Sequence, residues 1–391
     1  MTKLPQGWEV KKLGDIAEIS SGGTPSRNKK EYWENGTIPW VKIKDIKEKF
    51  ISTTEEFITE DGLKNSSAKL FKKGTLLYSI FATLGEVAIL DIDATTNQAI
   101  AGINIKENNI NSLYLMYFLR SIKDEICSKG RGVAQNNLNL TILKQIKIPL
   151  PPLQEQERIV GILDESFAKI DESIKILEQD LLNLDELIQS ALQKAFNPLK
   201  DNTKENYKLP QGWEKFNFDN IFYSPSSKNY QLNTKDYLEK GCIPIIDQSK
   251  KFIIGYSNNY EKVFKINNCN NSCIIFGDHT RVLKFIDFDF IVGADGVKIL
   301  LNKDIERFNT KFLFFQLLYK DIPLLGYRRH FSVLKQNTFS IPPLKEQEQI
   351  ASHLDELSSH VKNLKQNYQM QIKNLQELKK SLLDKAFQGR L

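Results

Sequence analysis

The chain is one unit written twice, and this repeat constrains the fold more than any local pattern does. The pentapeptide LPQGW occupies residues 4–8 and again 209–213. A longer motif reads PPLQEQERIVGIL at 151–163 and PPLKEQEQIASHL at 342–354. Internal repeats have to be recognised before local structure is assigned, because missing one gives the wrong fold. We therefore expect a pseudo-twofold molecule made of two equivalent halves.

Each copy combines a part of variable length with a part of fixed length. The Pro-Pro motif and the KAF tripeptide (194–196 and 385–387) recur with one offset of 191 residues. The segments before them differ, since Trp8 to Pro151 is 143 positions and Trp213 to Pro342 is 129. Each copy is therefore a variable body followed by a constant tail. The boundaries predict segments at 1–150, 151–197, 198–341 (with a linker at 198–208) and 342–391.

Both tails have the pattern of a long coiled-coil helix. Apolar residues recur at alternating spacings of four and three, which is the heptad seam of a coiled coil. About 44 residues at 1.5 Å each give a helix of about 66 Å. The second seam is less regular, with Gln371 and Ile372 in mid-run. The predicted seam is Leu163, Phe167, Ile170, Ile174, Leu177, Leu181, Leu184 and Ile188, and then Leu354, Leu357, Val361, Leu364, Tyr368, Leu375, Leu378 and Leu382.

A helix of this length with one apolar stripe needs a partner, and the other tail is the nearest one. The alternative is that each stripe packs only on its own body. Only residues 197–208 separate the end of the first tail from the second LPQGW. The second body must therefore lie at the end of the first helix and at the start of the second. We expect two antiparallel helices that separate the bodies, with Leu391 near the first body.

Charge is distributed unevenly between the tails and the bodies. Residues 153–196 carry a net charge of −6 and residues 344–387 a net charge of +1. The whole chain has a formal charge of +6, so the bodies and linker hold +11. Basic bodies on an acidic-to-neutral spacer suit a polyanion that is gripped at two places. The alternative is that these lysines and arginines are only a solvated surface.

Composition is that of an ordinary soluble protein, with 41% hydrophobic and 26% charged residues. The longest apolar runs fall short of the roughly 20 residues needed to span a bilayer. MTKLPQGWEV at residues 1–10 lacks the apolar core of a signal peptide. We expect a cytoplasmic protein that does not enter a membrane. Its four cysteines, which show no disulfide framework and should stay reduced there, are Cys127, Cys242, Cys269 and Cys273.

The two bodies mix strands and helices, so the predicted fold class is α+β. Residues 112–126 and 311–319 have helical patterns. Short β-rich runs predict strands at 37–43, 75–80 and 86–90 in the first body, and at 242–246, 272–276, 284–290 and 297–301 in the second.

Polar and basic loops punctuate these elements, and they hold the candidate DNA contacts. Arginine suits guanine edges and asparagine or glutamine suits adenine edges in the major groove, whereas lysine mostly holds phosphates. Aromatic residues in these loops could stack on bases or sugars, but next to glycine turns they are more often packing residues. The candidates are Thr24, Arg27, Lys29, Lys30, Tyr32, Arg131 and Asn136 in the first body, and Lys228, His279, Arg281, Arg328, Arg329 and His330 in the second.

Motifs for catalysis are missing from the sequence. It contains no dinucleotide-binding glycine motif, no P-loop and no Asn/Asp-Pro-Pro-aromatic motif of adenine methyltransferases. Cys269 and Cys273, with His279 nearby, lack the second Cys/His pair that would complete a zinc site. We therefore expect no catalytic residue, no metal and no cofactor on this chain.

Together these motifs resemble the specificity subunits of type I restriction-modification systems. The resemblance rests on LPQGW, GGTPSR at 22–27, IPW at 38–40 and the duplicated Pro-Pro-Leu-x-Glu-Gln helix, and it covers essentially the whole chain. The second body departs from the first, with SPSSKNY at 224–230 in place of GGTPSR. It carries GDHTR (277–281) and GADGVK (293–298), which also resemble elements of this family.

The resemblance implies a non-catalytic subunit of a restriction endonuclease and DNA adenine methyltransferase. Each body would be a target recognition domain that reads one half of a bipartite site in double-stranded DNA. The paired helices would set the spacing and dock two modification subunits, and ATP-dependent restriction subunits would join them. S-adenosylmethionine, ATP and Mg would then bind to those partners. The unequal bodies imply two different half-sites.

Three other functions compete with this one. The first is the specificity subunit of a related, type II-like system with a bipartite site, which this sequence alone does not separate from the type I case. A stand-alone DNA methyltransferase is disfavoured by the missing motifs. A coiled-coil adaptor that binds only proteins is disfavoured by the basic bodies.

Overall fold

The structure is a computed structural model, and it describes residues 4–130, 138–197, 209–269, 271–293, 295–320, 322–323 and 329–391. The chain divides into two compact units, Met1–Leu177 with Met370–Leu391, and Glu178–Gln369. Each unit holds one body together with part of both long helices. The boundaries between the units therefore fall within the two long helices, because each body is grouped with the helix turns that it contacts. Among the described residues no helix is long and apolar enough to cross a membrane.

The first body has a central five-stranded sheet in the order β2-β9-β6-β7-β4, a three-stranded sheet β5-β3-β8 and a pair β1-β10. Neighbours are antiparallel, except for the parallel pairs β3-β8 and β4-β7. Its strands are β1 (Glu9–Lys12), β2 (Ala17–Ser21), β3 (Ile38–Val41), β4 (Phe50–Ile51), β5 (Glu56–Ile58), β6 (Leu76–Ser79), β7 (Val87–Leu90), β8 (Thr95–Thr96), β9 (Ile100–Ile105) and β10 (Lys147–Leu150).

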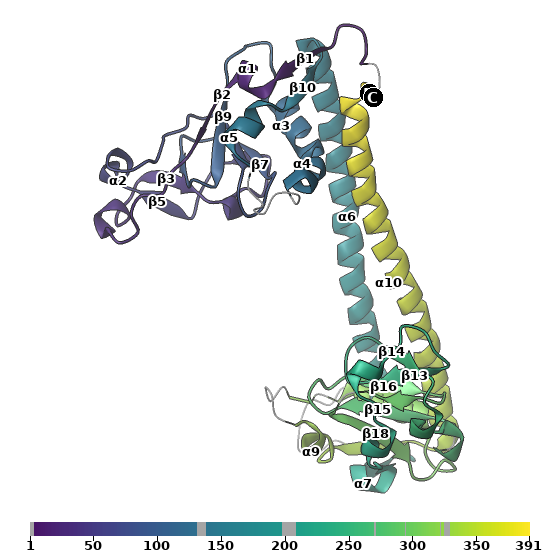
Figure 1. Ribbon diagram of the computed structural model, residues 1–391. Coiled ribbons are helices and arrows are strands. Elements are labelled where there is room, and N and C mark those ends of the chain that lie inside the picture. The colour runs from purple at the N-terminus through teal and green to yellow at the C-terminus, as the bar shows by residue number, and fades with distance from the viewer. Residues whose placement is uncertain are drawn as a thin grey trace. The chain divides into compact units, whose positions relative to one another are not determined.

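A short helix, α3 (Ser112–Ser121), covers this sheet on the side of the long helices (Figure 1). Asn111 begins α3 by accepting hydrogen bonds from the N–H groups of Leu113 and Tyr114. Tyr117 of α3 then packs edge-on against Phe167, so α3 lies between the central sheet and the long helices (Figure 1). The helices are α1 (Leu13–Ile16), η1 (Lys30–Tyr32), η2 (Ile43–Asp45), α2 (Glu60–Lys64), α3 (Ser112–Ser121), α4 (Lys123–Gly130) and α5 (Leu140–Lys144).

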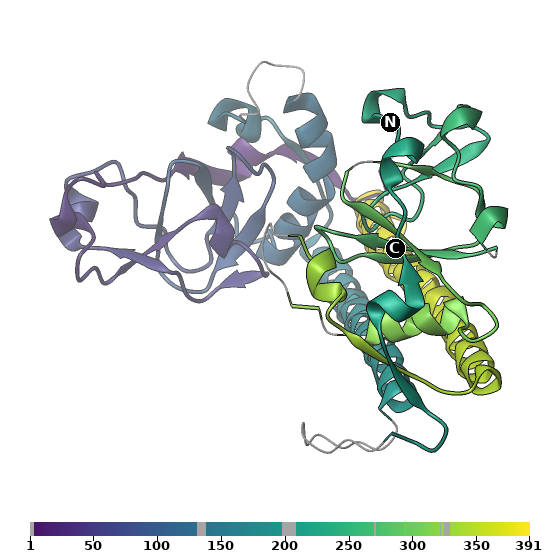
Figure 2. The ribbon, with the colours of Figure 1, turned by 90° about the horizontal axis from the view of Figure 1, so that it is seen from below.

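The second body repeats this topology with one strand fewer. Its sheets are β12-β18-β15-β16, β14-β13-β17 and β11-β19, which correspond in order to β2-β9-β6-β7, β5-β3-β8 and β1-β10. Seen from below, this body is the green part of Figure 2. Its strands are β11 (Glu214–Asn217), β12 (Phe222–Tyr223), β13 (Ile243–Ile246), β14 (Gly255–Ser257), β15 (Cys273–Gly277), β16 (Leu283–Ile286), β17 (Ile291–Val292), β18 (Val297–Asn302) and β19 (Thr338–Ile341).

The helices of the second body correspond to those of the first. α8 takes the place of α3, and Asn309 caps it through the N–H of Phe312. The helices are α7 (Phe218–Ile221), η3 (Ser227–Tyr230), η4 (Thr234–Asp236), η5 (Tyr260–Lys262), η6 (Ile266–Cys269), α8 (Thr310–Tyr319) and α9 (Phe331–Leu334). The mixture of helices and strands in each body confirms the predicted α+β class.

Predicted strands and helices agree with observed ones in position, and they differ at their ends. The helix predicted at 112–126 is divided at Ile122 into α3 and α4. The strand predicted at 284–290 ends at Ile286, although Phe290 still forms an isolated bridge with Phe264.

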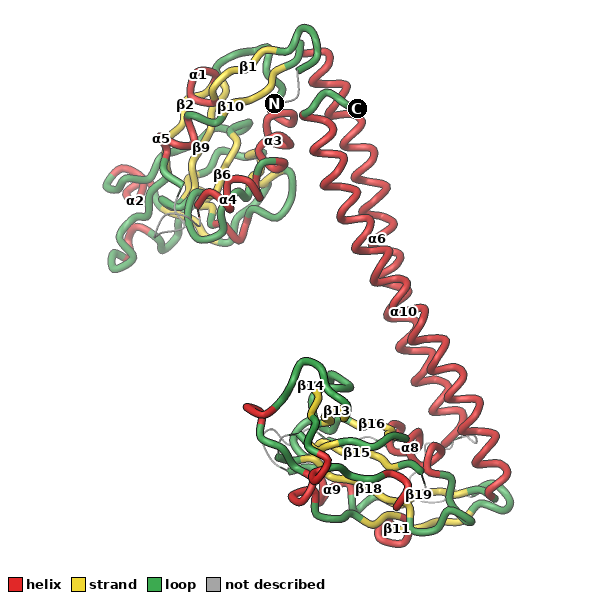
Figure 3. The backbone as a smooth tube through the Cα atoms, turned by 45° about the vertical axis from the view of Figure 1, so that its right-hand side comes forward, coloured by secondary structure: helices red, strands yellow, loops and turns green. Residues whose placement is uncertain are grey.

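The two tails are single helices of 44 residues each, α6 (Leu153–Phe196) and α10 (Leu344–Phe387). They lie side by side (Figure 3) and pair in antiparallel fashion in each unit. In unit one Arg158 bonds to the carbonyl of Leu391 and Asp171 pairs with Lys379. In unit two Asp185 pairs with Lys365. The partner's number thus falls as the number along α6 rises, which confirms the antiparallel prediction.

The seam of α6 is as predicted, and that of α10 needs a correction. Every predicted seam residue of α6 is buried or half-buried. In α10, Leu364 and Leu378 are exposed to 40% and 45%, whereas Lys365 and Lys379 face α6. At these two positions the prediction was wrong by one residue because it required an apolar side chain, whereas the other six predicted seam residues of α10 are buried or half-buried. A lysine can fill a seam position with its methylene stem and keep its ammonium group at the edge.

A buried glutamine explains why the Pro-Pro-Leu-x-Glu-Gln motif occurs twice. Gln156 is only 2% exposed, and its Oε1 accepts from the N–H of Asn111 at 2.9 Å. Its Nε2 donates to the carbonyls of Asn109 and Pro151 at 3.0 and 2.9 Å. This one side chain ties the start of α6 to the loop before α3. A buried amide with every polar atom bonded is stable there, and few other residues could replace it.

Candidate nucleic-acid interface

Antiparallel pairing brings several loops to one edge of the first body's central sheet. Ser21 at the end of β2 lies opposite Ala101, and Ser79 at the end of β6 lies opposite Ile100. The chain therefore leaves β2 and β6, and enters β9, at the same edge. We call this the first edge, made of residues 22–33, 80–86 and 96–99.

The second body has an equivalent edge. Gly277 at the end of β15 lies opposite Val297 at the start of β18, and Phe276 lies opposite Leu283. Loops from distant parts of the sequence gather beside them. We call this the second edge, made of residues 224–231, 247–249, 277–282, 295–298 and 329–331.

Two glycines let the GGTPSR segment lie against the loop before β9. A Cβ atom at Gly22 would lie 1.9 Å from Thr96 Oγ1, and one at Gly23 would lie 2.3 Å from Ser67 Oγ. The Gly23 N–H instead donates to the carbonyl of Thr96 at 2.8 Å. The next residue, Thr24, donates its hydroxyl to Gln98 Oε1 at 2.5 Å. The close approach thus sets an exposed glutamine amide beside Thr24.

Arg27 is held in one orientation by aromatic and acidic neighbours. Its guanidinium carbon lies 3.6 Å from the centre of the Trp33 ring and 4.7 Å from that of Trp40. Its Nη2 lies 2.7 Å from Glu56 Oε2. Burial alone would raise the pKa of Glu56, but hydrogen bonds from Lys42 and Arg27 outweigh it and lower that pKa. The Arg27 side chain remains half-exposed at 50%.

The neighbouring candidates of the first edge are divided between the surface and the interior. Lys29 donates to the hydroxyl of Tyr32 at 2.9 Å, which raises the pKa of Lys29. Tyr32 itself is buried, with 6% exposed, so it packs rather than offering a face for stacking. Lys30 is 84% exposed and pairs with Glu34 at 3.7 Å.

Asp278 joins two loops of the second edge. Its carbonyl accepts from the N–H of His330 at 2.8 Å, and its carboxylate accepts from the N–H of Phe331 at 2.8 Å. Lys298 Nζ approaches the same carboxylate at 4.0 Å. The GDHTR and GADGVK motifs and the start of α9, which are far apart in sequence, therefore meet at one place.

A second network in this edge links His279 and Asp295 through glutamine amides. Gln248 accepts from the N–H of His279 at 3.1 Å and donates to the carbonyl of Asp295 at 2.8 Å. Gln231 donates to Asp295 Oδ1 at 3.0 Å. His279 and Asp295 are both exposed. The edge thus presents a carboxylate and an imidazole on a hydrogen-bonded frame.

Arg281 has the left-handed backbone conformation, with φ of 61°, and its side chain is held by a backbone carbonyl. Its Nη1 donates to the carbonyl of Ile322 at 2.5 Å, while its Nε is buried without a hydrogen-bond partner. Arg281 therefore holds the segment after α8, and it would have to release Ile322 in order to contact a base with that nitrogen.

The structure removes His330 from the candidate set. Its side chain is completely buried, and its Nδ1 lies 2.9 Å from the carbonyl of Asp278. In the first body the equivalent position is filled by Leu138. The N–H of Leu138 donates to the carbonyl of Ile80, just as the N–H of His330 donates to the carbonyl of Asp278. Lys228 and Arg329 are exposed. Arg131, Asn136 and Arg328 lie outside the described residues.

Reasoning from the sequence missed the polar side chains Gln98, Gln231, Gln248 and Asp295. The three glutamines lie outside the arginine- and glycine-rich motifs that mark the predicted candidates, and Asp295 lies inside GADGVK but is neither basic nor an amide. An available signal was the pair Asn97-Gln98 directly before a strand, because two adjacent amides there suit a base edge. Among the described residues no group of His, Cys, Asp and Glu could hold a metal ion.

A single family model matches this chain twice, once over each repeat. The model for the type I restriction modification DNA specificity domain matches residues 5–181 and again 210–374. The MjaIX specificity subunit of Methanocaldococcus jannaschii is 32% identical over 256 residues, covering 62% of this chain and 58% of that protein. The EcoR124I/EcoR124II specificity subunit of Escherichia coli is 36% identical over 163 residues, which is 40% of each chain. The match thus spans about half the length of these relatives.

Solved structures share the fold over the whole chain. A chain from a study of complex assembly and conformational transition of the type I R-M system has a TM-score of 0.78, with 20% identity and 100% of both chains covered. The HsdS subunit from Thermoanaerobacter tengcongensis has a TM-score of 0.58, also with 20% identity, and covers 100% of this chain and 98% of that one. At 20% identity, these two likenesses show a shared fold and nothing more specific.

Proposed function

The chain belongs to the family of type I restriction modification DNA specificity domains, and on that premise we propose that it reads a bipartite DNA site, one half with each body. The observation that carries the proposal is the repetition of one topology whose edges hold different polar side chains. The first edge presents Gln98 and Arg27, whereas the second presents Asp295 and His279. Different side chains on one framework suit two different half-sites.

The chemistry of the two edges suggests what each would read. A glutamine amide suits adenine, because it can accept from N6 and donate to N7, while a carboxylate suits the N4 amino group of cytosine. Gln98 is fixed by Thr24 and Asp295 by Gln231. Lysines such as Lys30 would hold phosphates without regard to sequence. The excess of +11 outside the helices supports contact with a polyanion at both edges.

The long helices would set the distance between the two half-sites. A continuous helix of 44 residues has a fixed rise of about 1.5 Å per residue, so its length constrains whatever is anchored to it. The contacts of Gln156 and Gln347 anchor each body to the start of one such helix. We therefore assign the spacer between half-sites to the helix pair.

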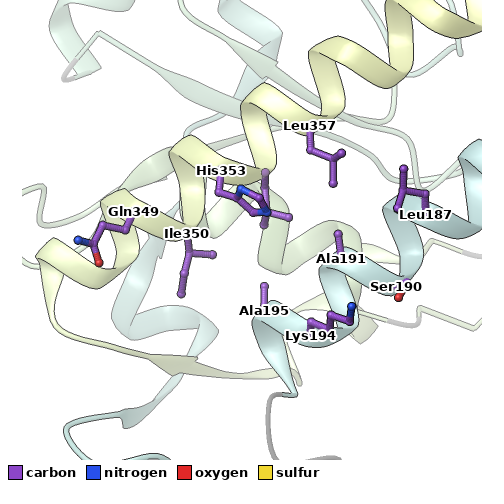
Figure 4. A pocket seen from close by; sticks show the side chains of 10 residues that line it. Leu187, Ser190, Ala191, Lys194, Ala195, Gln349, Ile350, His353 and Leu357 are labelled. Carbon is purple, nitrogen blue, oxygen red and sulfur yellow. The ribbon is translucent and has the colours of Figure 1, made fainter.

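The helices would also bind the modification subunits. Large apolar side chains face solvent on both helices, and a bound protein would cover them. A groove of about 540 Å³ opens between α6 and α10 in unit two, beside Ala191, Ala195 and Ile350 (Figure 4). The exposed apolar residues are Ile176, Leu182, Leu187, Leu364, Met370 and Leu378.

In this proposal the chain carries no catalytic residue, and the chemistry belongs to its partners in the cytoplasm. Two modification subunits would bring S-adenosylmethionine, and restriction subunits would bring ATP and Mg. The chain's own residues would bind and orient the DNA. Their effect on activity would appear as a change in which sites are modified.

Selection from random DNA tests the proposal. The full chain, with its modification subunit, is used to select duplexes from a randomised library at several salt concentrations. We expect two short specified blocks separated by unspecified bases, with binding that weakens steeply as salt rises. A single continuous block, or no sequence preference at any salt concentration, would show that the chain is not a bipartite reader.

A further inference from the structure

Two cross-helix ion pairs lie two heptads apart along the helix pair, one in each unit. In unit one, Lys379 Nζ lies 2.6 and 2.8 Å from the two carboxylate oxygens of Asp171. In unit two, Lys365 donates to Asp185. Both the lysines and the aspartates are 14 residues apart, or two heptads, so the two contacts join the same heptad positions. Each lysine side chain is only 28% exposed, because its stem fills a seam position.

Lys379 is also held by the seam itself. Its ammonium group lies 4.9 Å from the centre of the Phe167 ring, one helical turn before Asp171. A cation over an aromatic face and beside a carboxylate is attracted by both. The lysine thus replaces an apolar seam residue without leaving the interface.

Comparison of the two repeats shows that these ion pairs need one α6 helix and one α10 helix. With the offset of 191, the residues of α6 equivalent to Lys365 and Lys379 are Ile174 and Ile188. The residues of α10 equivalent to Asp171 and Asp185 are Lys362 and Gln376. Each helix therefore carries only one partner of each ion pair, and neither helix carries both.

Pairing between like helices would be unfavourable for this reason. If α10 packed in the same register on α10 of a second copy, Lys379 would face Lys362 and Lys365 would face Gln376. If α6 packed on a second α6, Asp171 and Asp185 would lie against isoleucines with no cation, and two helices of net −6 would meet. Like charges in contact are destabilising by about as much as opposite charges stabilise.

We propose that the pairs Asp171–Lys379 and Asp185–Lys365 make α6 the preferred partner of α10 over a second copy of either helix. The inference is independent of DNA reading, since it concerns only how the helices choose each other. It gives the halves of a repeated chain a means of pairing with each other, so that one molecule keeps two different bodies.

Charge reversal in the full chain tests this. One variant carries Lys365→Glu with Lys379→Glu, a second carries Asp171→Lys with Asp185→Lys, and a third combines all four. The matched control is Lys373→Glu with Lys385→Glu, which changes the charge of α10 equally at two exposed positions. Lys373 of this control pairs with Glu377 of its own helix.

At low salt we expect each double variant to unfold about 2–6 °C below the control. The shift is modest because each variant loses two partly exposed ion pairs and gains two like-charge contacts, and each of these changes costs little free energy. The fourfold variant should return to within about 1–2 °C of the original chain, and high salt should shrink all of these differences. A fourfold variant no more stable than the summed effects of the double variants would overturn the proposal.

Self-association supplies the second readout. In the variant with Lys365→Glu and Lys379→Glu, the carboxylate introduced at position 379 of one copy would face Lys362 of another. We expect this variant to dimerise more readily by light scattering than the original chain or the fourfold variant. Equal self-association of the three proteins would show that these charges do not choose the partner.

Discussion

Gln156 in the first unit and Gln347 in the second make the same set of hydrogen bonds. Each accepts from the N–H of an asparagine, Asn111 or Asn309, and donates to two backbone carbonyls. The two edges differ instead. The loop before β9 places Gln98 beside Thr24, and the loop before β18 places Asp295 beside Gln231.

This contrast separates a framework from the surface it carries. The residues that join body to helix must satisfy the same buried backbone groups in both copies, so they cannot vary without leaving polar atoms unpaired. The edge residues bond mostly to one another and to solvent, so each edge can change without disturbing the helix junction. A repeated chain can thus keep one architecture and present two different chemistries.

Exchanging a whole body should have the largest effect. Replacing residues 209–341 with the body of another specificity subunit should change one half-site completely and leave the other unchanged, because each edge is built within its own body. Sequencing of methylated DNA from a host that carries the chimera and its modification partner measures both half-sites. A simultaneous change in both would show that the bodies do not read separately.

Removing a junction glutamine should destabilise one unit only. Gln156→Ala leaves the Asn111 N–H and two carbonyls without their partner, which should cost about 3 kcal/mol. Hydrogen exchange should rise at the start of α3 but not at the start of α8, and Gln347→Ala should give the opposite result. Equal exchange at both helices in either variant would refute the view that each junction acts locally.

Much of the framework could be predicted from the sequence, because its signals are long. The repeat, the heptad seam and the antiparallel pairing needed only spacing and chain length. Lys365 and Lys379 were missed at the seam, since the pattern counts apolar residues and does not see a buried lysine stem. The helix was likewise continued past Ile122, where no proline or glycine marks the break.

The edges were predictable only as regions. Basic and glycine-rich loops indicated where they lie, but which side chain reaches the surface depends on contacts between distant segments. His330 stands beside two arginines in sequence, yet it is buried at the position that Leu138 fills in the first body. Gln98 stands in plain sequence, and it becomes notable only when GGTPSR folds against it.

A single edge residue should change specificity by less than a body exchange does. Gln98→Ala should cost about 1–3 kcal/mol against the preferred base at one position of the first half-site, with the second half-site unchanged. Lys30→Ala is the matched control, because a phosphate contact should weaken all sequences alike and flatten the salt dependence. Competition binding with single-base variants measures this. Equal loss on cognate and random DNA for Gln98→Ala would remove it as a base contact.

Acid should disturb the first edge by the smallest amount. Lys42 and Arg27 hold the pKa of Glu56 below its usual 4.5, so its stabilising contribution is complete above that value and is lost as pH falls through the lowered pKa. We expect the fluorescence of Trp33 and Trp40 to change below about pH 4.5 as Arg27 is released. The same acid titration of Glu56→Gln should lack this transition. Persistence of the transition in that variant would assign it to another group.

The central claim is that two bodies read two half-sites at a distance set by the helix pair. Inserting one heptad in each helix, after Leu177 and after Tyr368, preserves the seam and lengthens the pair by about 10 Å. This corresponds to about three base pairs of straight DNA at roughly 3.4 Å each, with a twist of about 100° that could lower affinity. Site selection from a random-spacer library, with the modification subunit bound, measures the spacer directly. We predict unchanged half-sites with a longer spacer, and selection of the original spacer at full affinity would contradict the account.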